Sequence, residues 1–236
     1  MSYRLAPCGY IQGQDDHNTS PLSGRPAEQT NDIKALVNAA RADSHCYNNQ
    51  VVAIGGLAGA SHAIWVALDK SVSTVWPEWG PDHRLQAAVG LSGAYDYSDR
   101  TPECYMDLTQ FENDIENYTN TCKREDPNGP IDQKRFSPVT KVTSDAPPIY
   151  IINSEEDPQP WHQIIDMQCA LENAGVTNFK LWTIPHSSQH SFAYWRTPIC
   201  DTIPYTVYPL VKDRVIEFLD SHVTNSHKRF FFAVCH

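Results

Sequence analysis

Short runs of apolar residues recur along the chain and predict buried strands. The first run, Val51-Val52-Ala53-Ile54, ends in Gly55-Gly56, and such continuous apolar character is typical of a strand buried on both faces of a parallel sheet. Three later runs have the same character, at residues 85–93, 148–153 and 179–184. Other segments repeat apolar residues every three or four positions, which predicts amphipathic helices. The predicted helices span residues 32–42, 58–68, 162–174 and 211–222.

The alternation of strands and helices indicates an α/β fold with an open, mostly parallel sheet covered by helices on both faces. The length of 236 residues suits a single domain of this class, spanning residues 1–236. Three segments break the alternation: a long polar loop at 7–31, a cap-like insertion at 96–145 and an irregular tail at 226–236. We expect the insertion to lie over one end of the sheet.

Composition narrows the classes of partner. The chain has 18 Lys and Arg against 28 Asp and Glu, and its net charge of −10 disfavours nucleic acid and anionic membrane surfaces. No run of about 18 apolar residues predicts a transmembrane helix, and residues 1–7 lack the apolar run of a signal peptide. None of the seven cysteines forms a CxxC pair, but Cys104 and Cys122 flank a polar segment and are either a disulfide pair or free thiols. The compartment, cytoplasmic or secreted, stays open.

The loops that follow the predicted strands are the candidate site, because ligands of an open parallel sheet bind at the carboxyl ends of its strands. Between a strand and a helix, residues 55–59 (GGLAG) carry the glycines of a G-x-S-x-G nucleophile elbow. An acidic loop at 153–158 and a histidine-containing loop at 185–192 follow two later strands. Together these loops predict a site for acyl transfer.

The order elbow, acid, histidine resembles that of α/β-hydrolases. Further stretches resemble the carboxylesterase branch of that family, which has hormone-sensitive-lipase-like and feruloyl-esterase-like members. These stretches are YRLAP at 3–7, PAEQTND at 26–32, LSGAYD at 91–96, SPV at 137–139 and PPIY at 147–150. The resemblance implies an α/β-hydrolase fold that hydrolyses carboxylic esters through a Ser-His-Asp triad, with no metal and no organic cofactor. Its expected ligand is a small-molecule ester or another apolar compound.

The resemblance also implies roles for single residues. Asp157 matches the acid of the family and His190 its general base. The acid would orient the imidazole and stabilise its cation, while the imidazole accepts the proton of the nucleophile and later returns it. Glu156 and His186 are the alternative acid and base. We expect a carboxylate oxygen of Asp157 within about 2.6–3.2 Å of the His190 ring.

Two departures from the family pattern bear on activity. Leu57 stands where the family has its nucleophilic serine, and a leucine has no lone pair that attacks a carbonyl, so the acyl-enzyme route is closed. The backbone N–H of Ala58 remains a candidate oxyanion donor, and Ser61, one helical turn further on, is expected to pack or cap rather than react. The tight turn should give Leu57 a positive φ.

The second departure is the absence of a glycine loop. In the family, an HGGG-type loop with further oxyanion donors precedes the YRLAP stretch, and nothing similar occurs in this sequence. We therefore expect half of the oxyanion hole and the first strands to be missing. The strand at 51–54 would then have an open edge, through which an oligomer can form.

Three explanations for Leu57 stay open: an engineered change, a degenerate gene copy, or a protein that now only binds a ligand. An impaired esterase and a non-catalytic binding protein that uses the former acyl pocket are therefore competing hypotheses. Aromatic residues in the nearby loops either favour aryl or bulky acyl groups or pack the insertion against the sheet. They are Tyr95, Tyr97, Tyr105, Trp161, Phe192, Tyr194 and Trp195.

Overall fold

A computed structural model describes residues 26–42, 50–71, 84–102, 107–119, 129–195 and 211–223. At its centre, four parallel strands form one sheet in the order β1-β2-β3-β4. The strands are β1 Val52–Gly56, β2 Ala87–Leu91, β3 Ile149–Ser154 and β4 Phe179–Ile184. Ile152 is paired with Leu91 on one side and Trp182 on the other, so neighbouring strands end at the same edge of the sheet.

Burial on both faces explains the apolar runs in the sequence. Every residue of β1, β2 and β3 is buried, whereas β4 is mostly half-buried. Alternate residues contribute to two separate apolar clusters, with Ala53 and Ile151 in one and Ile54 and Ile152 in the other. Within the described part of the chain, β1 and β4 are the outer strands of the sheet.

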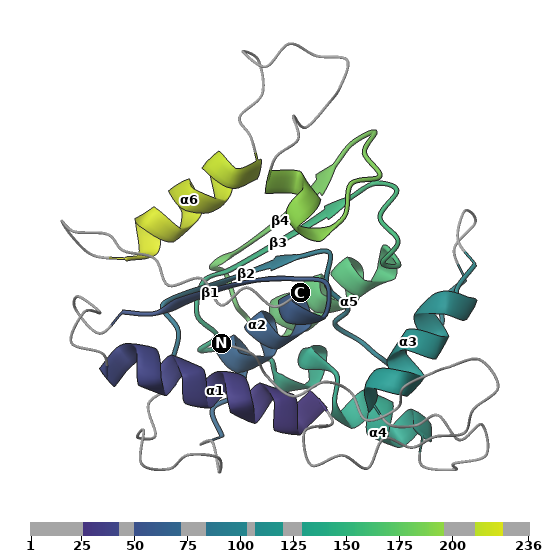
Figure 1. Cartoon of the computed structure of the whole chain (residues 1–236), viewed down its shortest axis with the longest axis horizontal. Helices are drawn as coiled ribbons and strands as arrows, with labels where there is room; N and C mark the ends of the chain where they lie inside the picture. Colours follow the sequence, from purple (N-terminus) through teal and green to yellow (C-terminus); the bar gives the residue numbers. More distant parts are fainter. Residues whose placement is uncertain are drawn as a thin grey trace.

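Helices cover both faces of the sheet (Figure 1). On one face lie α1 Pro26–Ala42, α2 Ala58–Leu68 and α5 His162–Asn173, and on the other lies α6 Val211–His222. The predicted α/β fold with a parallel sheet covered on both faces is therefore confirmed.

The segment between β2 and β3 contains α3 Thr109–Thr119, α4 Gly129–Arg135 and a 3₁₀ helix, η3 Pro138–Lys141. A third apolar cluster joins this segment to α2 through Trp65, Phe111, Ile115 and Phe136. In Figure 1, α3 lies on the side of the sheet toward which the strand arrows point. A second 3₁₀ helix, η4 Ser191–Trp195, follows β4.

The first helix begins at Pro26, so the predicted loop is wrong for residues 26–31. Proline suits the first turn of a helix, where its missing N–H is not needed. The periodicity of apolar residues did not reveal this turn because its buried side chains are polar. Gln29 and Thr30 both hydrogen-bond to the ring of His62 on α2 at 3.0 Å, so they are held by polar contacts.

Some expectations concern residues outside the described ranges, namely the stretch at 3–7, the pair Cys104 and Cys122, and the tail at 226–236. Among the described helices, none combines the length and the apolar character that a membrane crossing needs.

Candidate active site

The turn from β1 into α2 has the backbone of a nucleophile elbow. Leu57 has φ 54° and ψ −124°, a region that costs most residues about 1–3 kcal/mol. A Cβ atom on Gly55 would lie 1.9 Å from the carbonyl oxygen of Gly59, so this turn needs glycine at position 55. The Leu57 N–H donates to the carbonyl of Leu91 on β2 at 3.0 Å, and the Leu57 side chain is 42% exposed. The apex is therefore strained, anchored to the sheet and open to solvent.

The first turn of α2 offers a donor beside this apex. Ala58 is the first residue of the helix, where backbone N–H groups have no partner within the helix. Its N–H makes no hydrogen bond in the described part of the chain. It is thus free to bind an oxygen that develops negative charge next to position 57.

The acidic loop and the histidine loop meet at the same end of the sheet. Nδ1 of His190 lies 2.9 Å from Oδ1 of Asp157, within the expected range. Asp157 is 3% exposed. Burial raises the pKa of this carboxyl group, but hydrogen bonds from His190, Ser92 and Tyr194 outweigh burial and hold the pKa below its usual value. The carboxylate is therefore charged at neutral pH and is in position to orient the imidazole.

Two hydroxyl groups that the sequence analysis did not single out hold the carboxylate from its other side. Ser92, in the turn after β2, and Tyr194, in η4, both donate to Oδ2 of Asp157. Both residues are almost fully buried, and each hydroxyl oxygen also accepts a backbone N–H, from Ser191 at 2.9 Å and from Ser154 at 3.0 Å. The two hydroxyls hold the Asp157 carboxylate, and the two backbone N–H groups hold the hydroxyls in place.

The base segment is docked onto the elbow. Ser191 follows His190, and its hydroxyl oxygen lies 1.9 Å from the place that a Cβ atom on Gly56 would occupy. A larger residue at position 56 would have to displace the side chains of Ser191 and Phe192, so the segment after His190 packs closely against the turn before Leu57. The three sequence-predicted residues, Leu57, Asp157 and His190, are therefore brought to one end of the sheet.

Comparison with known proteins finds similarity to esterases. No protein-family model matches the chain. Two curated proteins of Mycobacterium tuberculosis are similar to it: esterase LipQ, 27% identical over 194 residues, and esterase LipC, 29% identical over 161 residues. These matches cover 80% and 65% of this chain but 44% and 38% of the two relatives, so the chain spans less than half of their length.

Solved structures give the same fold. Esterase 2 of Thermogutta terrifontis with butyrate bound has a TM-score of 0.60 at 19% identity, over 84% of this chain and 66% of that one. An acetyl ester-xyloside bifunctional hydrolase from Caldicellulosiruptor lactoaceticus has a TM-score of 0.61 at 18% identity, over 84% and 67%. The chain therefore shares the α/β-hydrolase fold with these solved structures, and the two curated proteins similar to it are esterases.

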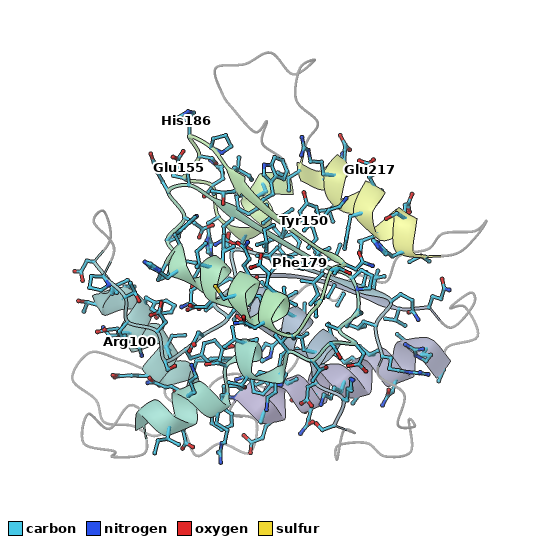
Figure 2. All side chains as sticks on the ribbon, turned by 180° about the vertical axis from the view of Figure 1, so that it is seen from behind. Arg100, Tyr150, Glu155, Phe179, His186 and Glu217 are labelled. Carbon is cyan, nitrogen blue, oxygen red and sulfur yellow. The ribbon has the colours of Figure 1, made fainter. Side chains whose placement is uncertain are left out.

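The alternative acid and base take no part in the hydrogen-bond network of Asp157. Glu156 is exposed, and its N–H donates to the carbonyl of Ser187. Figure 2 labels His186 and Glu155 at an outer corner of the molecule, where the His186 ring lies 3.6 Å from the Glu155 carboxylate. Ser61 is 2% exposed and accepts the N–H of Ala94 at 3.2 Å, which is a packing role.

A pocket of about 260 Å³ adjoins the elbow. Leu57, Ala58 and Ser61 form one wall, and α3 supplies four residues of another. The loop after β2 adds Ala94 and Tyr97, and the acidic loop adds Gln159. In the described ranges, no group of three or more His, Cys, Asp and Glu residues is arranged to hold a metal ion.

The interpretation that the loop aromatics line a substrate pocket is wrong for two of them. Tyr95 is fully buried with its hydroxyl against Gly90 and Gly93, and Tyr194 is bound to Asp157. Tyr97 does line the pocket. The side chains of Tyr105 and Trp195 lie outside the described part of the structure.

Leu57→Gly is expected to leave the free energy of unfolding unchanged or to raise it by about 1 kcal/mol. Glycine relieves the strain of the positive φ, and the exposed leucine side chain loses little packing. The control is Ile131→Gly, an exposed residue inside α4, which should lose about 1 kcal/mol. Urea unfolding measures both variants. A Leu57→Gly loss equal to that of the control would show that the turn is unstrained.

Gly55→Ala is expected to lower the free energy of unfolding by about 2–3 kcal/mol, because its methyl group meets backbone atoms of Gly59 and Ala60 that cannot rotate away. Gly175→Ala is the control. That glycine has φ 75° but open space around it, so alanine there costs only the backbone strain of about 1 kcal/mol. Equal losses in the two variants would contradict the close contact at the elbow.

Proposed function

We propose that this chain is a carboxylic-ester hydrolase scaffold whose acid and base are intact and whose nucleophile position is occupied by Leu57. The observation that carries the proposal is the 2.9 Å contact between Nδ1 of His190 and Oδ1 of Asp157 beside a strained, solvent-exposed elbow. This constellation suits acyl transfer, which needs a base, an orienting carboxylate and an oxyanion donor around one reacting atom.

The chemistry assigned to each group follows from its atoms. A serine hydroxyl at position 57 would attack the ester carbonyl, and Nε2 of His190 would accept its proton because Nδ1 is bound to Asp157. The N–H of Ala58 would bind the oxyanion. Leucine forms no bond to the carbonyl carbon, so the chain as it stands has no acyl-enzyme route. What remains is binding of the ester and slow attack by water.

A second function, binding without catalysis, is favoured by the Leu57 side chain itself. It lies in the wall of the pocket beside Ala58 and adds apolar surface where the family has a hydroxyl. An apolar wall of this kind favours retention of an ester or a similar apolar compound.

The test compares hydrolysis of p-nitrophenyl acetate by the unmodified chain and by Leu57→Ser. We expect the serine variant to release p-nitrophenolate measurably faster, with a burst that reports the acyl-enzyme. Leu57→Ala, which also removes the leucine but supplies no hydroxyl, should stay at the rate of the unmodified chain. Equal rates for the serine and alanine variants would overturn the proposal.

A further inference from the structure

One face of α3 lines the pocket that adjoins the elbow. Phe111, Asp114, Ile115 and Tyr118 all line the pocket, and their spacing of three, one and three residues lies on one side of a helix. Phe111 and Ile115 are each 5% exposed, and the apolar cluster that joins α3 to Trp65 of α2 holds this face in place. The wall is therefore built into the fold.

The volume of the pocket limits the size of the group that enters it. A cavity of about 150 Å³ holds a benzene molecule, so a pocket of about 260 Å³ takes one aryl ring with an arm of two or three atoms. Leucine, alanine, isoleucine and aromatic side chains make up most of the lining, which favours an apolar ring over a sugar.

A single charged residue, Asp114, stands among the pocket-lining residues. One carboxylate oxygen of Asp114 accepts a hydrogen bond from the Gln110 amide at 2.8 Å, and no cation is paired with this carboxylate in the described ranges. The neighbouring acid Glu112 is different, because it lies 3.5 Å from the Arg100 guanidinium. Among the described residues, Arg100 is a cation on this side, 5.9 Å from the Phe111 ring centre, and it is also bound to the carbonyls of Tyr97 and Asp99.

We propose that this pocket selects a small aryl group that carries a positively charged amine on a short arm, with Asp114 as the specificity-determining residue. An ammonium group near Asp114 gains a favourable charge interaction, while a carboxylate there is repelled. That such a group is part of an ester substrate rests on the proposed function. Binding of the charged aryl group itself is independent of the proposed function.

The experiment therefore measures binding to the unmodified chain, by titration followed through amide NMR signals of Ala58 and Ile115. The probes are 2-phenylethylammonium, 2-phenylethanol and 3-phenylpropionate, which share a ring and differ in charge. Because Asp114 is exposed, we expect the ammonium probe to bind about two- to fivefold more tightly than the alcohol, as for a surface ion pair, and the propionate to bind most weakly. Added salt should reduce the difference.

Asp114→Asn should bring the ratio of ammonium to alcohol affinity close to one. The matched control is Glu116→Gln, which removes the same charge from the same helix at a position outside the pocket lining and should keep the ratio. An unchanged ratio in Asp114→Asn, or probe-induced shifts absent from both amides, would overturn this inference. Failure of Leu57→Ser to hydrolyse esters would overturn the proposed function alone, because the binding ratio does not depend on it.

Discussion

In a Leu57→Ser background, His190→Ala is expected to lower the turnover of p-nitrophenyl acetate by about 10²- to 10⁴-fold, the range typical of general acid–base catalysis. A serine hydroxyl is a weak nucleophile until a base removes its proton. His190 is held by Asp157 through one ring nitrogen, which leaves the other nitrogen for that proton. Initial rates, corrected for spontaneous hydrolysis, measure the effect.

His186→Ala in the same background is the matched control. The His186 side chain is 84% exposed and faces Glu155 rather than the elbow, so its loss should change the rate by less than about twofold. If His186→Ala abolishes hydrolysis and His190→Ala does not, the base has been assigned to the wrong histidine. If neither change matters, no histidine of this loop acts as the base.

The elbow and the two loops were predictable from sequence because each depends on neighbouring residues. The glycine at position 55 is required by a contact within a single turn, and the strand before the turn and the helix after it are visible as local patterns. The order of acid and histidine along the chain then follows from the order of parallel strands. Requirements that involve only neighbouring residues can be recognised from a single sequence.

The support of the acid was not predictable, since it joins residues from three distant segments. Ser92 lies in the stretch LSGAYD, which carried the family resemblance, yet nothing in the stretch reveals that its hydroxyl points at Asp157. The sequence marks Tyr194 only as an aromatic side chain, whereas in the structure its hydroxyl donates a hydrogen bond to Asp157. The pocket wall formed by α3 was not predicted either. The apolar face of α3 packs against α2 and the loop after β2, not against the sheet.

Asp157→Asn is expected to lower the free energy of unfolding at pH 7 by about 1.5–3 kcal/mol, the range for hydrogen bonds to a charged group. Ser92 and Tyr194 both donate to the same carboxylate oxygen, and their own oxygens already accept backbone N–H groups. Asparagine that keeps its oxygen toward His190 turns an N–H₂ group toward these donors. One of these hydroxyls can turn to the oxygen of the other, 2.5 Å away, but at least one buried hydroxyl hydrogen then loses its acceptor.

The loss of unfolding free energy in Asp157→Asn should become smaller as the pH falls. Hydrogen bonds hold the pKa of Asp157 below its usual value in the folded chain. The stability from its charged form is therefore fully present above the unfolded pKa of about 3.9 and is lost as the pH falls through the lower folded value. Urea unfolding at pH 7 and in steps below pH 4 should show the gap between parent and Asp157→Asn narrowing in acid.

Glu155→Gln is the control for this prediction, because it removes an exposed carboxylate two residues away in the same loop. Surface ion pairs contribute little, so its free energy of unfolding should stay within about 0.5 kcal/mol of the parent at every pH. A gap between parent and Asp157→Asn that is small at pH 7, or that is constant into acid, would mean that the hydroxyls of Ser92 and Tyr194 do not stabilise a charged acid. His190 would then lack the fixed carboxylate on which its proposed role as a base depends.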